Sequence, residues 1–153
     1  GILEELKCPF IINQNRYSIF DRTIEQNGLK EAAVEEGKGI IAFSPLAQGM
    51  LTDRYLKGIP SDSRVMTDGR FLKEGQLSEE KLMKIRALNE VAKERGESLA
   101  RMALKWVLKD DVVTSVLVGA SKPEQLVENI KVIESVGFTE EELQKIDEIV
   151  GLE

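Results

Sequence analysis

Apolar residues follow two patterns along the chain: short unbroken runs, and longer stretches in which they recur every three or four positions. The short runs predict strands over residues 9–14, 39–43 and 114–118. In the first, Phe10, Ile11 and Ile12 are consecutive, which is typical of a strand buried on both faces. The longer stretches have the period of an amphipathic helix. Strands that alternate with helices predict an α/β fold built on a parallel sheet with right-handed crossovers.

Five helices are predicted, one over residues 29–36 and four that begin at capping residues. Ser78, Ser98 and Thr139 are expected N-caps, because a hydroxyl there accepts a hydrogen bond from a free backbone N–H of the first turn. Residues 121–124, which read Ser-Lys-Pro-Glu, are typical of a capping box with proline near the first helical position. The side chains expected to face the core from these four helices are Leu82, Ile85, Leu88, Val91 and Ala92; Leu99, Met102, Ala103, Trp106 and Val107; Leu126, Ile130 and Ile133; and Leu143, Ile146 and Ile149.

A polar stretch over residues 44–76 separates the second predicted strand from the helix that Ser78 opens. It is too long for an ordinary connector, so it is expected to be functional or to carry short helices of its own. Three cations in it, Arg54, Lys57 and Arg64, belong to a chain whose net charge is −6. A local excess of positive charge indicates an anionic ligand, and a solvated loop with scattered charges is the alternative.

The composition excludes several classes of function. With 153 residues, 42% of them hydrophobic and 31% charged, the chain is expected to form one domain over residues 1–153 with its own core. No apolar run approaches the roughly 18 residues of a membrane span, and the acidic balance disfavours nucleic acid as a partner. One cysteine and no histidine exclude an intrachain disulfide, a His-containing triad and a His-based zinc motif, and no metal site is predicted. No signal peptide is visible, so a cytoplasmic location is expected.

Polar and small residues lie at the end of each predicted strand. Residues 13–15 lie at the end of the first, Phe43 and Ser44 at the end of the second, and residues 119–121 follow the third. The carboxyl ends of parallel strands are where ligands bind in such folds, although polar turn residues are common at strand ends in any case. The sequence therefore predicts a ligand site at this edge, built without Gly-x-Gly-x-x-Gly or a Walker loop, neither of which occurs.

The residues at this edge indicate what kind of ligand they suit. Residues 121–124 offer free backbone N–H groups, a hydroxyl and a cation at the start of a helix, which suits a phosphate. Gln125, Glu128 and Asn129 lie one turn further, where they are able to hydrogen-bond a sugar or a base edge. Phe43 offers a flat face to a heteroaromatic ring. The alternatives are a capping box that only caps and a core phenylalanine that ends a strand.

Two longer segments resemble the aldo-keto reductase family. Residues 43–52, Phe-Ser-Pro-Leu-Ala-Gln-Gly-Met-Leu-Thr, resemble its strand-seven segment, and residues 119–129, Gly-Ala-Ser-Lys-Pro-Glu-Gln-Leu-Val-Glu-Asn, resemble its strand-eight cofactor segment. Gly-Ile-Pro at residues 58–60, followed by Ser63 and Arg64, is similar to a loop of the branch that contains potassium-channel beta subunits and bacterial glyceraldehyde-3-phosphate reductases. The resemblance covers nearly the whole chain, and the bacterial reductases are the closer match.

This resemblance implies the C-terminal part of a (β/α)8 TIM barrel, with about three of the eight parallel strands, in a family that binds NADP(H) and reduces aldehydes and ketones. It implies that Gln14 contacts the nicotinamide carboxamide, that Phe43 stacks on the nicotinamide where relatives have Tyr or Trp, and that Arg64 is a cation on the adenosine side. The implied cofactor-binding residues are Gln14, Phe43, Ser44, Pro45, Leu46, Gln48, Arg54, Arg64, Gly119, Ser121, Lys122, Gln125, Glu128 and Asn129.

No catalytic residue is assigned to this chain. The family's tetrad of Asp, Tyr, Lys and His comes from the first half of its barrel, and this chain has no histidine, while Tyr17 and Tyr55 occupy other motifs. A complete barrel also needs about 250 residues. The resemblance therefore implies the NADP(H)-binding portion of a carbonyl reductase, inactive alone. The alternative is a non-enzymatic half-barrel that forms a homo-oligomer through its open strand edges.

Overall fold

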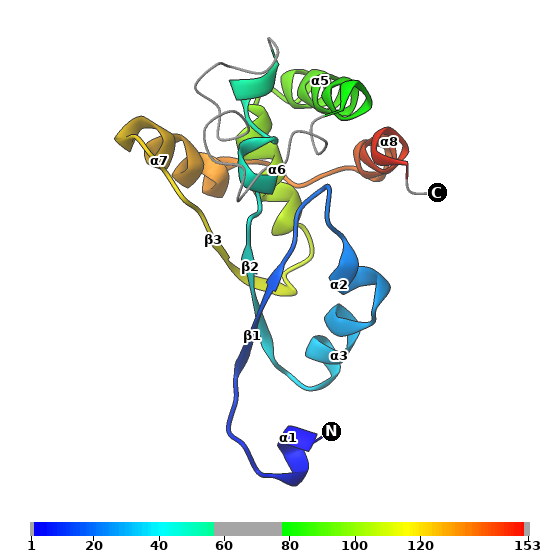
Figure 1. Cartoon of the computed structure of the whole chain (residues 1–153), viewed down its shortest axis with the longest axis vertical. Helices are drawn as coiled ribbons and strands as arrows, with labels where there is room; N and C mark the ends of the chain where they lie inside the picture. Colours follow the sequence, from blue (N-terminus) through cyan, green and yellow to red (C-terminus); the bar gives the residue numbers. More distant parts are fainter. Residues whose placement is uncertain (1, 57–77, 152–153) are drawn as a thin grey trace.

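The computed structural model describes residues 2–56 and 78–151 of the chain. Its strands are β1 (Ile12–Arg16), β2 (Gly39–Phe43) and β3 (Val113–Leu117). They form one parallel sheet in the order β1-β2-β3 (Figure 1), which confirms the predicted α/β fold. Arg16 pairs with Phe43, and Phe43 pairs with Leu117, so the carboxyl ends of the three strands lie at one edge.

Helices fill the connections between the strands. The α-helices are α1 (Ile2–Glu5), α2 (Thr23–Gln26), α3 (Leu29–Glu35), α5 (Glu79–Glu94), α6 (Leu99–Val107), α7 (Pro123–Ile130) and α8 (Glu140–Val150), and the short 3-10 helices are η1 (Ala47–Gly49), η2 (Asp53–Tyr55) and η4 (Lys131–Glu134). In Figure 1, α2 and α3 lie beside the strands, whereas α5, α6 and α8 gather near their upper end. Of the polar stretch at 44–76, the part up to residue 56 carries η1 and η2, and the rest lies outside the described residues.

The hydrophobic core joins the sheet to α5 and α6. Ile40 and Ala42 of β2 are fully buried, and so is Trp106 of α6. The inward faces predicted for α5 and α6 are confirmed in full, since every side chain expected there is buried. Of the three apolar positions predicted for α8, Ile146 is buried, and Leu143 and Ile149 pack against the same core.

Three of the four predicted helix caps are confirmed. The side chains of Ser78, Ser98 and Thr139 each accept a hydrogen bond from a backbone N–H in the first turn of the helix that follows. Thr139 and Glu142 together form a complete capping box, in which each side chain bonds the backbone of the other residue. Each of these helices therefore begins where its sequence pattern predicted.

The capping box predicted at residues 121–124 is wrong. Pro123 takes the first helical position of α7, so the N-cap is Lys122, which has no side-chain acceptor. Ser121 lies one residue too early to cap the helix. Gln125 Oε1 instead accepts hydrogen bonds from the backbone N–H of Ser121 at 2.9 Å and from its Oγ at 3.1 Å. The glutamine side chain therefore ties the approaching segment to the first turn.

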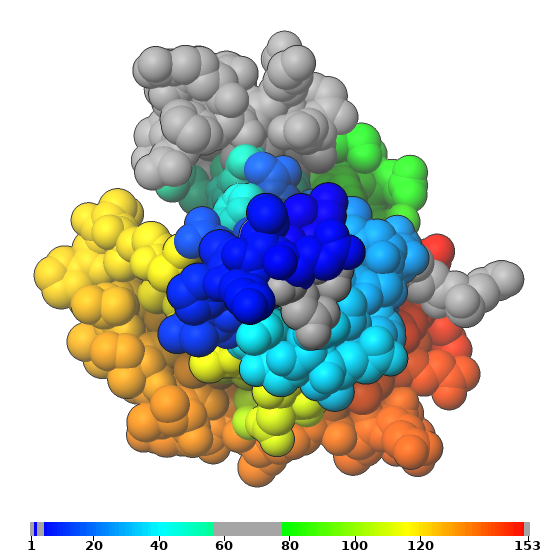
Figure 2. Space-filling model, turned by 90° about the horizontal axis from the view of Figure 1, so that it is seen from below, coloured from blue at the N-terminus to red at the C-terminus, as the bar shows by residue number. Residues whose placement is uncertain are grey.

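The first strand is shifted from its predicted position and is not buried on both faces. It covers Ile12–Arg16 rather than residues 9–14, and Ile11 is 79% exposed. β1 is an edge strand of the described sheet, so it has a hydrogen-bonded neighbour on one side only. Gln14 and Arg16 lie on a face of β1 that nothing in the described residues covers. Figures 1 and 2 show the segment before β1 projecting on the outside of the molecule.

The apolar stripe that was predicted to bury α7 is exposed. Leu126, Ile130 and Ile133 are 45%, 55% and 81% exposed, and Val127 is 59% exposed. α7 follows β3, the other edge strand, which begins and ends one residue earlier than predicted. The pattern was recognised correctly, but the described part of the chain contains no second layer to pack against it.

A cluster of charged side chains surrounds the buried hydroxyl of Tyr17. The hydroxyl donates a hydrogen bond to Glu25 of α2 and accepts one from Lys109 Nζ at 2.6 Å and one from Lys30 Nζ at 3.4 Å. Burial raises the pKa of Tyr17 far above its usual range, so the hydroxyl keeps its proton. Lys109 also pairs with Glu25 at 3.2 Å and lies 3.7 Å from the centroid of the Trp106 ring. The cluster therefore ties α2 and α3 to the end of α6.

Acidification is expected to remove the contribution of Glu25 to stability. Burial alone would raise the pKa of this carboxyl, but the hydrogen bond from Tyr17 and the charges of Lys109 and Arg22 outweigh burial and lower the pKa to about 2. An ordinary glutamate titrates near 4.5. The ionised carboxylate therefore stabilises the fold above pH 4.5, and this stabilisation is lost as the pH falls from 4.5 to 2.

Urea unfolding of Glu25→Gln at two pH values tests this expectation. The substitution should lower the free energy of unfolding by on the order of 2 kcal/mol at pH 7 and by much less near pH 2.5. Glu90→Gln is the matched control, because Glu90 pairs with Lys93 on α5 and both side chains are 63% exposed; its unfolding midpoint should not move. An equal penalty for Glu25→Gln at both pH values would contradict the prediction.

Candidate functional site

The carboxyl ends of β1 and β2 bring an aromatic ring and a cation together. Phe43 ends β2, Arg16 ends β1, and the two residues are partners in the parallel register. The guanidinium carbon of Arg16 lies 5.6 Å from the centroid of the Phe43 ring, which is a cation–π distance. Gln14 lies two residues before Arg16 and therefore on the same face of the strand. The open face of the sheet presents an amide, a cation and a flat ring close together.

The chain leaves β2 through a loop with an unusual backbone. Ser44, Ala47 and Gln48 have positive φ angles of 54°, 47° and 59°, in the left-handed region that residues other than glycine rarely adopt. Pro45 is buried and Leu46 packs partly against the core, so these two residues anchor the loop. The Ala47 N–H donates a hydrogen bond to the Ser44 carbonyl at 2.9 Å. Strained backbone of this kind clusters at ligand-binding sites.

A cavity of about 380 Å³ opens between the exit of β1, this loop and the first turn of α5. Two of the residues that the sequence marked, Ser44 and Gln48, line it. Its full lining consists of Arg16, Ser18, Phe20, Asp21, Ser44, Ala47, Gln48, Met50, Ser78 and Lys81. Two cations against one carboxylate, together with three serine hydroxyls, suit an anionic ligand.

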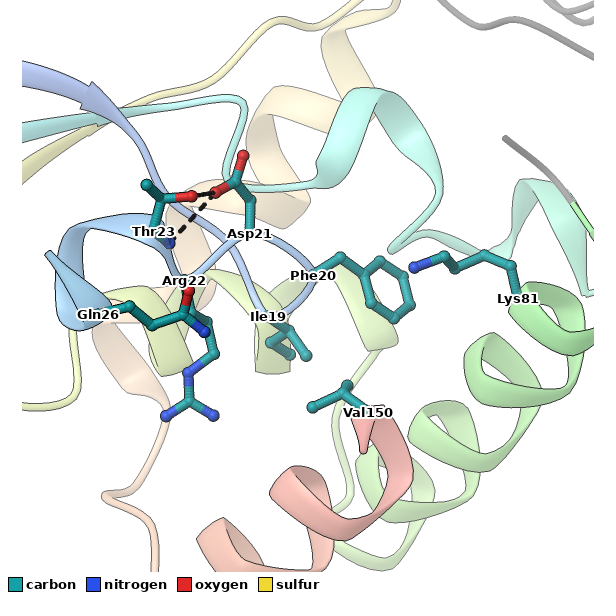
Figure 3. A pocket seen from close by; sticks show the side chains of 8 residues that line it. All are labelled: Ile19, Phe20, Asp21, Arg22, Thr23, Gln26, Lys81 and Val150. Carbon is teal, nitrogen blue, oxygen red and sulfur yellow. Dashed lines mark hydrogen bonds between the residues drawn. The ribbon is translucent and has the colours of Figure 1, made fainter. Parts of the chain in front are cut away.

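Lys81 of α5 lines this cavity. Figure 3 shows its ammonium directed toward the ring of Phe20, and the distance to the ring centroid is 4.0 Å. Burial, and then repulsion from Lys84, lower the pKa of Lys81. Asp21 accepts hydrogen bonds from the Thr23 N–H at 3.3 Å and from its hydroxyl at 2.9 Å. A second cavity, drawn in Figure 3, shares this wall and is lined by Ile19, Phe20, Asp21, Arg22, Thr23, Gln26, Lys81 and Val150.

The exit of β3 carries a second group of residues that the sequence marked. Gly119 and Lys122 are exposed, and Ser121 and Gln125 are joined by the hydrogen bonds described above. Because Leu117 of β3 pairs with Phe43, this exit begins beside the aromatic ring. The prediction that the residues following the three strands share one edge is therefore confirmed. Their roles toward a cofactor stay predictions.

Glu128 and Asn129 lie one turn into α7. Glu128 already has hydrogen-bond partners, and Asn129 is buried. The Glu128 carboxylate accepts hydrogen bonds from Ser98 Oγ at 3.0 Å, from Arg101 at 3.1 Å and from Lys131 at 3.0 Å. The hydrogen bond from Lys131 is the largest influence on the pKa of Glu128, which lies below its usual range. Asn129 is buried. A ligand that uses the Glu128 carboxylate has to share it with these cations.

Of the three cations that the sequence marked in the polar stretch, Arg54 alone lies among the described residues. Arg54 is exposed on η2, where Thr52 caps the turn by accepting a hydrogen bond from the Arg54 N–H at 3.3 Å. Arg64 lies outside the described residues, as does Lys57.

Sequence reasoning missed Arg16 and Lys81. Arg16 was excluded because the first strand was predicted to end at Gln14, two residues before its true end. A strand placed correctly would have put Arg16 at the carboxyl edge. Lys81 gave no signal in the sequence, because it is one of several charged residues in the first turns of an amphipathic helix.

No group of three or more His, Cys, Asp or Glu side chains within residues 2–56 and 78–151 is placed to hold a metal ion. Over the same residues, no helix combines the length and the apolar character that crossing a bilayer requires.

Fold and site together define a class of protein. Parallel strands in chain order, helices in the connections, an uncovered sheet face and polar residues at the carboxyl edge are features of part of a (β/α)8 barrel. The family model described as "Aldo/keto reductase family" matches residues 2–151. The chain belongs to the aldo/keto reductase family.

Curated relatives agree with this assignment. The chain is 48% identical over 153 residues to an L-glyceraldehyde 3-phosphate reductase of Escherichia coli O157:H7, covering 98% of this chain and 44% of that protein. It is 37% identical over 146 residues to a putative voltage-gated potassium channel subunit beta of Schizosaccharomyces pombe, covering 92% of this chain and 42% of that protein. The chain therefore spans less than half the length of these relatives.

Solved structures show the same partial match. A glycerol dehydrogenase from Gluconobacter oxydans superposes with a TM-score of 0.72 at 29% identity, over 92% of this chain and 42% of that one. An aldo-keto reductase from Bacillus halodurans, in its holo form, gives 0.70 at 27% identity, over 97% and 46%. The predicted fold class, the C-terminal part of a TIM barrel with three parallel strands, is confirmed. The open edges and uncovered face lie where a barrel has further strands.

Proposed function

We propose that this chain provides the NADP(H)-binding part of an oxidoreductase that reduces a carbonyl group. The observation that carries the proposal is the placement of three features at the carboxyl ends of neighbouring strands: the Phe43 ring that ends β2, the loop after it with left-handed backbone at Ser44, Ala47 and Gln48, and the start of α7 after β3. A dinucleotide needs a flat surface for its ring, hydrogen-bond donors for its pyrophosphate and a positive pole for a further phosphate. Family membership supports the same cofactor class.

In the proposed complex, the residues divide by position along the edge. Gln14 hydrogen-bonds the nicotinamide carboxamide, and Phe43 stacks on the nicotinamide ring, which supplies the hydride when bound. The loop after β2 holds the pyrophosphate, and the exit of β3 holds the adenosine side. The loop residues are Ser44, Pro45, Leu46 and Gln48, and the adenosine-side residues are Gly119, Ser121, Lys122, Gln125, Glu128 and Asn129, with Arg54 and Arg64 as flanking cations.

In the proposed reaction, this chain binds and orients the cofactor, and another part of the enzyme supplies the proton. Carbonyl reduction needs an acid that protonates the oxygen as the hydride arrives. Tyr17 lies beside two lysines, is fully buried, and already donates its hydroxyl hydrogen bond to Glu25. It therefore has no access to a substrate. The proton donor is proposed to belong to the part of a complete barrel that this chain does not match.

Titration with NADPH and with NADH tests the cofactor assignment. The chain is expected to prefer NADPH, and Lys122→Ala combined with Arg64→Ala should narrow that preference about tenfold, because each removed cation forms a charge-assisted hydrogen bond with phosphate. Lys93→Ala, at an exposed lysine of α5, is the matched control and should leave the ratio unchanged. An unaltered ratio of the two dissociation constants in the double variant would refute these roles.

A second function is favoured by the uncovered surfaces. Both β1 and β3 are edge strands, and the stripe of α7 made by Leu126, Ile130 and Ile133 is exposed. A half-barrel that covers these surfaces with another copy of itself would be an association module rather than an enzyme part. Light scattering after size exclusion separates the two proposals: a monomer that binds NADPH supports the first, and a tight dimer indifferent to NADPH supports the second.

A further inference from the structure

We propose that Arg16 makes the cofactor site distinguish NADPH from NADP⁺, by placing a positive charge beside the ring on which the nicotinamide stacks. This inference rests on the proposed function and deepens it, because it adds a preference for one oxidation state of the same cofactor. Arg16 lies outside the cofactor set that the resemblance implies. Its role is that of a specificity-determining residue, which acts on the nicotinamide through its charge.

The register of the sheet fixes the position of Arg16. Arg16 ends β1 and is the register partner of Phe43, which ends β2. Partners on neighbouring strands direct their side chains to the same face of a sheet, and Gln14, two residues before Arg16, shares that face. The guanidinium carbon lies 5.6 Å from the centroid of the Phe43 ring. This cation therefore adjoins the two side chains proposed to contact the nicotinamide.

The charge of Arg16 is not balanced by an ion pair in the part of the chain that the structure describes. None of the ion pairs formed there includes Arg16. Asp21 lines the same cavity, and its carboxylate accepts two hydrogen bonds from Thr23. Lys81, the other cation of that lining, adds positive charge rather than balancing it. Contact with the face of Phe43 leaves the guanidinium charge in place.

The two oxidation states of the cofactor differ by one charge at this position. The nicotinamide ring is a cation in NADP⁺ and neutral in NADPH, whereas the phosphates and the adenosine are the same in both. A nicotinamide stacked on Phe43 comes within about 10 Å of the Arg16 guanidinium, close to the Debye length at moderate ionic strength. Repulsion at that distance weakens binding of the oxidised ring on the order of threefold and leaves binding of the neutral ring almost unchanged. Because NADP⁺ is a product of the proposed reaction, this repulsion favours its replacement by NADPH.

Calorimetric titration of the whole chain with NADPH and with NADP⁺ tests this inference. Arg16→Gln should tighten binding of NADP⁺ about threefold relative to NADPH, because it removes the repulsion. Arg16→Lys keeps the charge at the end of β1 and should retain most of the original ratio of dissociation constants. Arg86→Gln, at an exposed arginine of α5, removes the same charge elsewhere and is the matched control, so the ratio should stay unchanged. Adenosine 2′,5′-bisphosphate, which has no nicotinamide, should bind Arg16→Gln as it binds the unmodified chain, which verifies that the variant is folded.

Other results overturn the inference, and each has its own meaning. An unchanged ratio in Arg16→Gln shows that the charge does not act on the nicotinamide. Equal weakening of both nucleotides assigns Arg16 to a cofactor phosphate, and equal tightening means that the guanidinium only obstructs the ring. A ratio that changes as much in Arg16→Lys as in Arg16→Gln means that shape matters and charge does not. An unmodified chain that binds neither nucleotide overturns the proposed function as well, whereas the other results leave it standing.

Discussion

Replacing Trp106 with alanine is expected to remove a large part of the stability of this chain. Trp106 is fully buried, its ring lies 5.2 Å from that of Tyr17, and two cations approach it, Lys109 at 3.7 Å and Arg22 at 5.0 Å. Truncating a buried tryptophan costs about 3–5 kcal/mol. A domain has only about 5–15 kcal/mol in total, and the truncation here also leaves two charged groups beside an empty space.

Urea unfolding followed by circular dichroism measures this loss, since Trp106 is the single tryptophan and its fluorescence disappears with it. Met83→Ala, at a side chain 58% exposed on α5, is the control and should leave the midpoint nearly unchanged. Trp106→Phe keeps a ring and removes an indole N–H that has no hydrogen-bond partner, so it should retain much of the stability. A loss below about 1 kcal/mol in Trp106→Ala would contradict the central role of this side chain.

If the proposed division of roles holds, adding the part of the barrel that this chain does not match is expected to produce carbonyl reduction. A separately produced N-terminal portion of an L-glyceraldehyde 3-phosphate reductase, the part that this chain does not match, should pair with the edges of β1 and β3 and cover the stripe of α7. The general acid that it brings contributes about 100- to 10,000-fold to rate by itself, and positioning adds to this. Oxidation of NADPH in the presence of an aldehyde should therefore appear in the mixture and not with this chain alone.

The control for this experiment is an N-terminal portion whose tetrad tyrosine is replaced by phenylalanine. It should still associate, as judged by light scattering, but it should give no oxidation of NADPH. Robust turnover by this chain alone, or an associated mixture that stays inactive with the intact portion, would overturn the division of binding and proton transfer between the two parts.

Much of the fold was predictable because local rules and tertiary packing agree over most of the chain. Ser78, Ser98 and Thr139 cap their helices as expected, and the apolar spacing of α5 and α6 marks side chains that are buried. The unexpected exposure of β1 and of the α7 stripe has one cause. A hydrophobic pattern reports that a side chain needs a partner, and it does not report whether the partner lies in the same chain.

The site was predictable to the extent that it depends on strand order. Phe43, Ser44 and Ser121 all follow from the carboxyl ends of neighbouring strands, because parallel strands present these ends at one edge. Arg16 was missed because strand ends are the least certain feature of a sequence pattern. Lys81 was missed because its position depends on how α5 packs against the exit of β1, which no local pattern encodes.

The left-handed backbone at Ser44, Ala47 and Gln48 has a consequence for how any ligand would bind there. Each residue in this conformation destabilises the fold by on the order of 1–3 kcal/mol. Packing around the loop, including the burial of Pro45 within it, offsets that free energy when the chain folds. A loop whose backbone the fold already holds in place loses less conformational entropy when a ligand binds. Pro45→Ala gives this backbone more freedom before binding. The entropy of ligand binding should therefore become less favourable, even where no contact to the ligand is removed.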